Sequence, residues 1–465
     1  MSVKETGKMS DREKLFFSSK NVYDVIDDAE RARCYEYAEG YKRFLSNSRI
    51  EREAVREAVR LAEGRGFRPF EEGVKYAPGD KIYFDNRGKS LFLAVIGQRP
   101  TGEGINLAAA HIDSPRLDLK QIPLYEDSGV AMFKTHYYGG IKKFQWVTIP
   151  LELHGRVCRA DGSAVDVCIG REPGEPRFCI SDLLPHLASE QMKKSLAEGF
   201  TGEDLNIIIG TRPDPEKGED RVKLAIMKLL NEKYGIIEED FLSAELMAVP
   251  AFDVVDIGFD RSLIGGYGHD DRVCAYAELA AILDLERPVR TAVCLLVDKE
   301  EVGSTGVTGM QSEAFDRFMD SLCGDTRLYD CYARSFCLSA DVCNAFDPNY
   351  ASVSEKRNAA QLNHGLGIVK FTGSRGKSGA SDASAEVVSR VRTMFAKAGV
   401  VWQLAELGKV DAGGGGTVAM FTAVRNIDTI DAGVPVISMH APFEIISKAD
   451  AYMTYKGMRA LYDCD

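Results

Sequence analysis

The chain of 465 residues is about three times the ~150-residue length of a common domain, which favours more than one domain. Its hydrophobic content of 45% and charged content of 28% are typical of a folded enzyme, and a net charge of -12 argues against nucleic-acid binding because an acidic surface repels phosphate. Its apolar runs fall far short of the ~20 residues that cross a membrane, and its N-terminal segment lacks the apolar core of a signal peptide, so we expect a cytoplasmic protein without a membrane partner.

The first predicted elements are helical and lie within residues 10–64. Apolar residues recur there at helical spacing opposite a charged face, and two glycines then end the pattern. Strands are predicted at residues 81–84 and 91–96. They lie on either side of an Asn-Arg-Gly turn, which indicates a hairpin.

Residues 121–250 have the pattern of a β-rich segment. Alternating apolar residues predict strands at 147–153 and 165–169, joined by a turn at 159–162. From residue 250 onward, helical patterns alternate with apolar strand patterns, which indicates an α/β sheet. We therefore expect the β-rich segment to interrupt a larger α/β unit.

Four apolar runs are each followed by histidine or acidic residues. They are residues 105–110 before His111 and Asp113, residues 291–297 before Asp298, Glu300 and Glu301, residues 336–339 before Asp341, and residues 434–438 before His440. In open α/β sheets, ligands bind at the carboxyl ends of the strands. We expect these side chains to form one site there.

A glycine-rich loop at residues 265–268 opens a helix and adds Asp270 and Asp271, either of which can point into the site. Two histidines and three carboxylates exceed what one catalytic zinc ion needs. They suit two metal ions ~3.5–4 Å apart that share a bridging carboxylate, with zinc, cobalt or manganese as candidates. The paired acids Glu300 and Glu301 offer a general base beside a ligand, and Asp113 can orient the His111 imidazole.

Five segments of the sequence resemble the aspartyl aminopeptidase and vacuolar aminopeptidase I family, whose members are co-catalytic dizinc aminopeptidases. In family order, they are HIDSP (111–115), GHDDR (268–272), DKEEVGS (298–304), SADVCNAFDPNY (339–350) and VISMHAPFE (436–444). The resemblance implies that His111, Asp270 and Asp341 bind one metal ion and that Asp270, Glu301 and His440 bind the other, so Asp270 bridges the two ions. It also implies that Glu300 is the general base and that Asp113 orients His111. Asp271 is then an acidic residue at the start of a helix.

The resemblance also implies the architecture and the assembly. The family fold is α/β, with a central mixed sheet flanked by helices and a smaller inserted β-rich domain. It assigns residues 1–120 and 251–465 to the catalytic domain and residues 121–250 to the insert, which serves dimerisation or regulation. Family members form homo-oligomers, commonly dodecamers built from dimers, and His186 is expected to reach the active site of a neighbouring subunit.

Substrate binding is predicted at two places. The family's preference for acidic residues is tied to a basic side chain in a segment similar to that around Lys370, but the sequence that follows Lys370 differs from acid-specific members. The glycine run at 413–416 can bring backbone N–H groups close to a ligand, so Gly415 and Gly416 are predicted to line the substrate pocket. A simple loop is the alternative there.

Other enzyme motifs are missing or incomplete. There is no H-E-x-x-H, no G-x-S-x-G and no C-x-x-C pair, and we expect most of the eleven cysteines to be small buried hydrophobic residues. Residues 373–378 look like a phosphate-binding loop. Too few residues precede Gly376 and Lys377, however, and Phe371 occupies the required glycine position.

The sequence thus predicts a cytoplasmic dizinc aminopeptidase that removes the N-terminal residue of short peptides, with a water molecule activated by the metals and Glu300 as the base. One alternative is a related dizinc carboxypeptidase or amide deacylase with the same ligands. The other is a non-catalytic assembly or cargo protein of the same fold, although a scaffold has no physical need for the complete ligand set.

Overall fold

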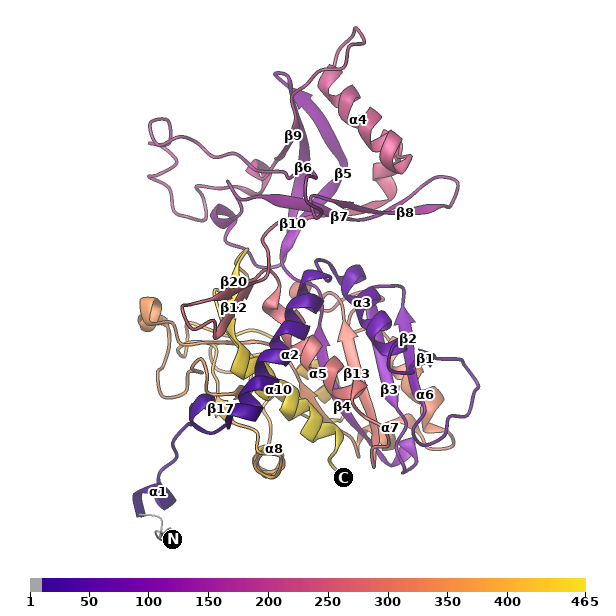
Figure 1. Ribbon diagram of the computed structural model, residues 1–465, viewed down its shortest axis with the longest axis vertical. Coiled ribbons are helices and arrows are strands. Elements are labelled where there is room, and N and C mark those ends of the chain that lie inside the picture. The colour runs from indigo at the N-terminus through magenta and orange to yellow at the C-terminus, as the bar shows by residue number, and fades with distance from the viewer. Residues whose placement is uncertain (1–10) are drawn as a thin grey trace.

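The computed structural model describes residues 11–465, which form three β-sheets with helices around them (Figure 1). Residues 1–10 lie outside the described part of the chain. They include the start of the predicted helical region and part of the segment that lacks a signal-peptide core. Among residues 11–465, no helix has both the length and the apolar character needed to cross a membrane.

A nine-stranded mixed sheet forms the lower body of the molecule in Figure 1. In spatial order its strands are β1 (Arg68–Pro69), β2 (Lys81–Asn86), β3 (Ser90–Val95), β13 (Thr291–Val297), β4 (Ile105–His111), β14 (Phe336–Ser339), β18 (Asp428–Gly433), β16 (Leu366–Val369) and β17 (Trp402–Leu404). The four neighbours β13, β4, β14 and β18 run parallel, so their carboxyl ends lie at one edge. Strands β3 and β16 pair antiparallel on either side of them.

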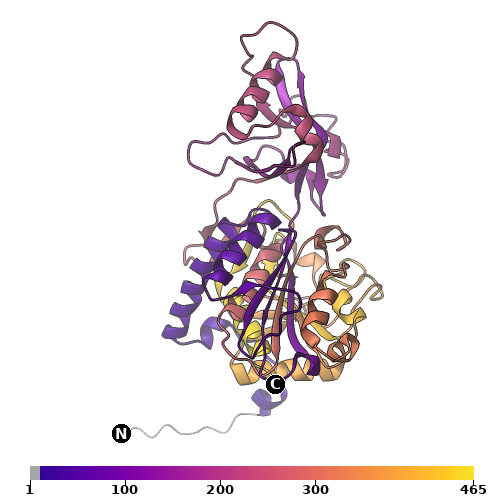
Figure 2. The same ribbon diagram turned by 90° about the vertical axis from the view of Figure 1, so that its right-hand side faces the viewer.

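Helices cover both faces of this sheet (Figure 2). One face carries α2 (Asp28–Ser46), α3 (Glu51–Glu63), α5 (His269–Leu283), α8 (Ala385–Ala398) and α10 (Lys448–Tyr462), and the other carries α6 (Ala314–Cys323), α7 (Leu328–Tyr332) and α9 (Ala419–Val424). The short α1 (Asp11–Leu15) lies near the N-terminal end of the described chain.

Burial on both faces explains why the central strands are apolar throughout rather than alternating. Successive side chains of a strand point to opposite faces. In β4, Ala108 and Ala110 therefore pack in the core beneath α5 and α10, whereas Leu107 and Ala109 pack in the core beneath α6 and α7. Both faces of the sheet are thus packed against helices, and this packing positions its strand ends.

A six-stranded antiparallel sheet forms the upper body in Figure 1 and has its own core, which includes Phe133, Trp146 and Leu246. In spatial order its strands are β8 (Ala164–Ile169), β7 (Leu151–Cys158), β10 (Ala244–Pro250), β5 (Arg116–Asp127), β6 (Val130–Tyr138) and β9 (Ile207–Gly210). Helix α4 (Arg221–Tyr234) packs on β5, β6 and β9. The division of the chain into domains at residues 121 and 250 stays a prediction.

A third sheet has five short strands and lies close to the upper body in Figure 1. Its strands in spatial order are β11 (Val255–Ile257), β12 (Leu263–Gly266), β20 (Glu444–Ser447), β19 (Pro435–Ile437) and β15 (Cys343–Asn344). Strand β19 follows β18 of the large sheet after a single residue, Val434. The chain thus passes directly from the large sheet into this one.

Most predicted elements are present with small shifts in their bounds. The predicted helical region is interrupted twice: residues 16–27 separate α1 from α2 and hold only the short 3-10 helix Val22–Asp24, and residues 47–50 separate α2 from α3. The predicted hairpin is formed by β2 and β3. Helix α4, in the β-rich segment, was not predicted. Val222 of this helix is buried, Met227, Leu230 and Tyr234 pack on the core of the upper body, and Gly235 ends the helix with a left-handed φ of 67°.

Candidate metal centre

Three parallel strands bring predicted ligands to one edge of the large sheet. His111 is the last residue of β4, Glu300 and Glu301 lie in a short 3-10 turn after β13, and Asp341 follows β14. Strand β4 pairs with both β13 and β14, so the three strand ends are adjacent. The expectation from the sequence pattern is met for these residues because parallel strands end on the same side.

His440 reaches this edge from a different sheet. Its preceding strand, β19, pairs with β15 and β20 rather than with the large sheet. The expectation that four strands of one sheet supply the ligands is therefore wrong for the fourth. The apolar run before His440 looks the same in sequence, but the chain has already left the large sheet at Val434.

Asp270 lies between the two histidines. Its Oδ1 is 3.2 Å from His111 Nε2, and its Oδ2 is 3.1 Å from His440 Nε2. The residue is 3% exposed and belongs to the first turn of α5. Each oxygen of this one carboxylate therefore faces a different imidazole, which is the arrangement of a bridging ligand.

Of the remaining carboxylates, those of Asp341 and Glu300 lie near His111, and that of Glu301 lies near His440. His111 Nε2 is 3.9 Å from both Asp341 Oδ1 and Glu300 Oε2. On the other side, His440 Nε2 is 3.7 Å from Glu301 Oε1. Two groups of side chains have ligand atoms close enough to hold an ion, and His111 belongs to both. The first group is His111, Glu300 and Asp341, and the second is His111, Asp270 and Glu301.

Both imidazoles are oriented by backbone carbonyls. His111 Nδ1 donates to the Asp113 carbonyl oxygen at 3.0 Å, and His440 Nδ1 donates to the Gly140 carbonyl oxygen at 2.8 Å. In the neutral ring, a proton on Nδ1 leaves the Nε2 lone pair for a metal ion, and both Nε2 atoms lie close to Asp270. Gly140 follows β6, so the upper body helps to position a side chain of the centre.

Asp113 links the strand ends of β4 and β13. Its carboxylate accepts hydrogen bonds from the backbone N–H groups of Glu300 at 3.1 Å and Glu301 at 3.3 Å, and from the Tyr138 hydroxyl at 2.7 Å. Burial alone would raise the pKa of Asp113, but the neighbouring His111 outweighs it and lowers that pKa. Tyr138 was not singled out from the sequence, because nothing local connects it with residue 113.

Glu444 is a second supporting carboxylate that sequence reasoning missed. Its two oxygens accept hydrogen bonds from the backbone N–H groups of Asp270 at 3.1 Å and His440 at 2.7 Å. Burial, reinforced by the charge of Asp270, raises the pKa of Glu444 to about 8. Glu444 lies four residues after His440, at the end of the segment VISMHAPFE, and this proximity in sequence is the one local feature that links it to the centre.

The electrostatics of the centre show an excess of negative groups. Burial, reinforced by the Asp270 charge, raises the pKa of Glu300 and raises that of Glu301 much further. Burial opposes the charging of His440, yet Asp270 and Glu301 raise its pKa to about 10. Glu301 Oε1 is buried and has no hydrogen-bond partner. Nitrogen and carboxylate donors with unsatisfied charge fit divalent metal ions.

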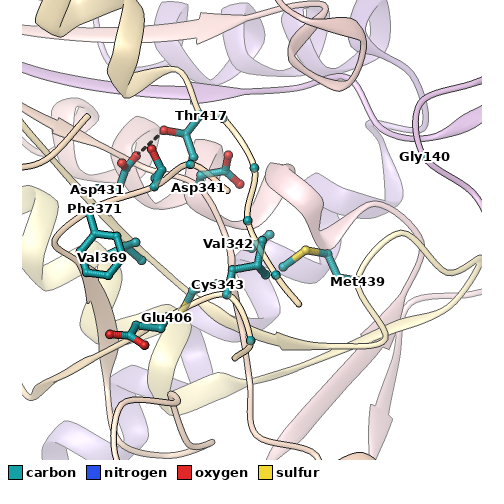
Figure 3. A pocket seen from close by; sticks show the side chains of 18 of the residues that line it. Gly140, Asp341, Val342, Cys343, Val369, Phe371, Glu406, Thr417, Asp431 and Met439 are labelled. Carbon is teal, nitrogen blue, oxygen red and sulfur yellow. Dashed lines mark hydrogen bonds between the residues drawn. The ribbon is translucent and has the colours of Figure 1, made fainter. Parts of the chain in front are cut away.

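A cavity of about 510 Å³ opens onto these residues, and its walls are mixed in character. Val369 and Phe371 lie on one side and Met439 on the other, while the Thr417 hydroxyl donates to Asp431 at 3.0 Å (Figure 3). Arg375, Lys377 and Lys409 supply cationic groups to the lining. The predicted Gly415 and Gly416 also line the cavity, and the Gly415 carbonyl accepts from the Gly373 N–H at 2.7 Å.

Two predicted residues lie elsewhere. Lys370 does not line the cavity, and its ammonium pairs with Asp382 at 2.8 Å although both neighbours in sequence, Val369 and Phe371, face the cavity. His186 is exposed in the long connection between β8 and β9 of the upper body and does not line the cavity of its own chain. Asp271 is buried beside Asp270 but is absent from both ligand groups at the centre.

The fold and the centre define a class of protein: an α/β metallohydrolase with paired histidine–carboxylate groups at the edge of a mixed sheet. The family model described as aminopeptidase I zinc metalloprotease (M18) matches residues 44–462. The chain therefore belongs to this family of zinc metallo-aminopeptidases, which confirms the resemblance read from the motifs, the α/β fold class and the prediction of an enzyme.

Similar proteins cover nearly the whole chain. A probable M18 family aminopeptidase 1 from Clostridium acetobutylicum is 50% identical over 452 residues, which are 95% of this chain and 97% of that protein. The crystal structure of an M18 aminopeptidase from Thermotoga maritima has a TM-score of 0.93 at 43% identity, covering 96% of this chain and 100% of that one. The aminopeptidase I structure from Clostridium acetobutylicum has a TM-score of 0.92 at 47% identity, covering 97% and 100%.

Proposed function

We propose that the protein is a cytoplasmic aminopeptidase that uses two zinc ions to remove the N-terminal residue of short peptides. The observation that carries the proposal is the position of Asp270, whose two oxygens lie 3.2 and 3.1 Å from two different histidines. In this proposal, His111, Asp270 and Asp341 hold one ion, and Asp270, Glu301 and His440 hold the other. Cobalt and manganese accept the same donor atoms.

Glu300 is the proposed general base. Two bound divalent ions would lower the pKa of a water molecule to about 7 and polarise the peptide carbonyl. Glu300 lines the cavity, and its Oε2 lies 3.9 Å from His111 Nε2. Burial raises the pKa of its carboxyl group, which makes the carboxylate a better proton acceptor. The same carboxyl group can then pass its proton to the leaving amine.

The cavity supports a short substrate. Its size of about 510 Å³ lies in the range of small-molecule sites and suits one or two residues rather than a folded chain. Apolar side chains and the cations Arg375, Lys377 and Lys409 line it together. These cations can receive an acidic side chain or the carboxylate of a short peptide. Lys370 would bind substrate only in a conformation in which its ion pair with Asp382 is broken.

Assembly is a further part of the proposal. The exposed segment around His186 carries a group of exposed apolar side chains, namely Leu183, Leu184, Leu187, Met192 and Leu196. Such a group marks an interaction surface. We propose that residues 121–250 mediate a dimer in which His186 reaches the partner's cavity, and that dimers build a dodecamer. The protein shares its fold with a yeast structure described as a dodecamer, at 18% identity.

The experiment that tests the proposed chemistry compares two neighbouring glutamates. Glu300→Gln keeps the shape but removes the proton acceptor, so kcat should fall about 10²–10⁴-fold while elemental analysis still finds two metal ions per subunit. Glu301→Ala is the matched comparison and should lose one ion. A near-normal kcat in Glu300→Gln would overturn the role of the base.

Substrates with free and blocked N-termini separate the aminopeptidase from its rivals. Aminoacyl-p-nitroanilides with a free amine should be cleaved after zinc, cobalt or manganese is added back to chelated protein. Cleavage of the N-blocked forms at equal rates would instead indicate a deacylase or carboxypeptidase. Tight binding of both ions without any turnover would favour the non-catalytic assembly protein.

A further inference from the structure

A second group of ligand-type side chains lies where the two bodies of the molecule meet. Glu53 belongs to α3 of the lower body, His154 to β7 and Cys168 to β8 of the upper body. Strands β7 and β8 pair antiparallel with His154 directly opposite Cys168. One ligand atom from each of the three residues lies within 4.8 Å of the other two. None of the three lines the cavity of the candidate centre.

His154 is the central member and is fully buried, with a side-chain exposure of 0%. Its Nδ1 lies 2.7 Å from Glu53 Oε1, and its Nε2 lies 3.3 Å from Glu152 Oε1. Neither His154 Nε2 nor Glu152 Oε1 makes a hydrogen bond. Glu152 Oε1 still has the Arg49 guanidinium as an ion-pair partner at 3.1 Å. Buried polar atoms without a hydrogen bond are costly, so His154 Nε2 is the atom that requires an explanation.

Glu53 is held in place so that one oxygen remains for this cluster. Its Oε2 accepts a hydrogen bond from the Arg49 backbone N–H at 2.9 Å, which leaves Oε1 facing His154. Arg49 also pairs with Glu152 at 3.1 Å, and both side chains are almost completely buried. The carboxylates on either side of His154 are therefore fixed by other contacts.

We propose that Glu53, His154 and Cys168 bind a divalent metal ion, with zinc as the best match to the ligand types. Imidazole nitrogen, thiolate sulfur and carboxylate oxygen are all zinc ligands, and a water molecule or a second oxygen can complete four-coordination. The ion would join α3 to β7 and β8 and so clamp the two bodies together. This proposal does not rest on the proposed function, because it uses none of the residues of the candidate centre.

Glu152 has a defined role in this arrangement. When Nδ1 of His154 binds an ion, the Nε2–H group can donate to Glu152 Oε1, 3.3 Å away, after a small rotation. A carboxylate that accepts from the other nitrogen of a metal-bound histidine fixes the ring and increases its basicity. His154 Nε2, which makes no hydrogen bond in the metal-free cluster, would then have one.

The surroundings of His154 favour a positive charge at this position. Burial opposes the charging of His154, yet the neighbouring Cys168, Glu152 and Glu53 raise its pKa well above the usual value. A divalent ion held by Glu53, His154 and Cys168 would place its positive charge in the same surroundings.

The test uses cobalt as the probe, because a Co²⁺–thiolate bond absorbs in the near ultraviolet and the proposed ligands of the candidate centre include no cysteine. The full-length protein, stripped with a chelator and reloaded with Co²⁺, should show this band. Cys168→Ser should lose it. Cys158→Ser, which changes the exposed cysteine at the end of the adjacent strand β7, should retain it, as should Glu301→Ala.

Metal content gives the second measurement. Zinc-loaded Cys168→Ser should contain one ion fewer per subunit than the wild type, whatever number the candidate centre holds. In the wild type, zinc should also slow alkylation of Cys168, which is partly exposed and needs no substitution for this assay. Equal metal content in the two proteins, no Cys168-dependent band and unprotected Cys168 would each overturn the proposal.

Discussion

Asp270 and its neighbours show how much single side chains contribute to the candidate centre. One carboxylate faces two imidazoles, and each imidazole is turned toward it by a backbone carbonyl. The backbone N–H of Asp270 itself is bound by Glu444. The geometry around the bridge therefore depends on groups that do not touch a substrate, and these groups can be tested separately from the ligands.

Tyr138 offers such a test at the residue scale. Tyr138→Phe removes only the hydroxyl that donates to Asp113 at 2.7 Å, so the carboxylate that positions the Glu300 turn loses one of its three donors. We expect metal affinity to fall about 10–100-fold, as is typical when a group that supports a ligand is removed. Competition with a chelator measures the change.

The neighbouring tyrosine supplies the control for that substitution. Tyr137→Phe makes the same chemical change one position earlier in β6, at a side chain that is 41% exposed. Its metal affinity should equal that of the wild type. If Tyr138→Phe binds metal as tightly as Tyr137→Phe, Asp113 is held sufficiently by the backbone N–H groups alone.

At the scale of elements, β10 of the upper body is joined to the lower body by Glu245. Its carboxylate pairs with Arg52 of α3 and, at 2.6 Å, with Lys89 of the β2–β3 turn. Burial would raise the pKa of Glu245, but these two cations lower it to about 2. These ion pairs connect the two bodies, because Glu245 lies in the upper body whereas Arg52 and Lys89 lie in the lower body.

The depressed pKa of Glu245 predicts a pH dependence of stability. Because the folded pKa lies below the ordinary 4.5, the stabilisation is complete above that pH and is lost as the pH falls from about 4.5 toward about 2. At neutral pH, Glu245→Gln should lower the free energy of unfolding by ~0.2–1 kcal/mol, since the side chain is 45% exposed and water screens the pairs.

Urea unfolding at neutral pH and at about pH 3 measures the effect. The difference in stability between the wild type and Glu245→Gln should shrink at the lower pH, because the wild-type carboxyl group is closer to protonation there. Glu232→Gln, at an exposed position of α4, serves as the matched control and should not alter the pH dependence. An equal loss of stability at both pH values would show that Glu245 acts through packing rather than charge.

At the scale of the whole molecule, the open question is whether the active site is complete in one chain. His186 is exposed among apolar side chains and lies outside the cavity of its own chain. If it stabilises the developing oxyanion in a partner's cavity, His186→Ala should assemble, bind both metal ions and lose about 10²–10³-fold in kcat, as for the removal of one oxyanion donor. Steady-state kinetics of the assembled protein measures this loss.

Mixing two inactive variants decides whether His186 acts across subunits. A dimer formed from His186→Ala and Glu300→Gln chains holds one site with both changes and one site with neither, so activity should return. Each variant mixed with itself is the control. If activity stays absent although mass spectrometry shows mixed dimers, His186 does not complete the partner's site.

The sequence by itself determined the composition of the candidate centre and most of the large sheet. His111, Glu300, Glu301 and Asp341 follow apolar runs, and parallel strands that are buried on both faces must end at one edge, so local patterns were enough to bring these residues together. The α/β class followed from the same alternation. The roles of the individual ligands and the division into domains stay predictions.

Only the tertiary structure decided which distant segments meet. His440 comes from a separate sheet, Tyr138 reaches Asp113 from the upper body, and the pair of Lys370 with Asp382 turns a predicted substrate residue away from the cavity. The group formed by Glu53, His154 and Cys168 likewise joins residues from three elements. Periodicity and spacing report on a side chain's own element, whereas these contacts depend on how separate elements pack, and no local pattern records that.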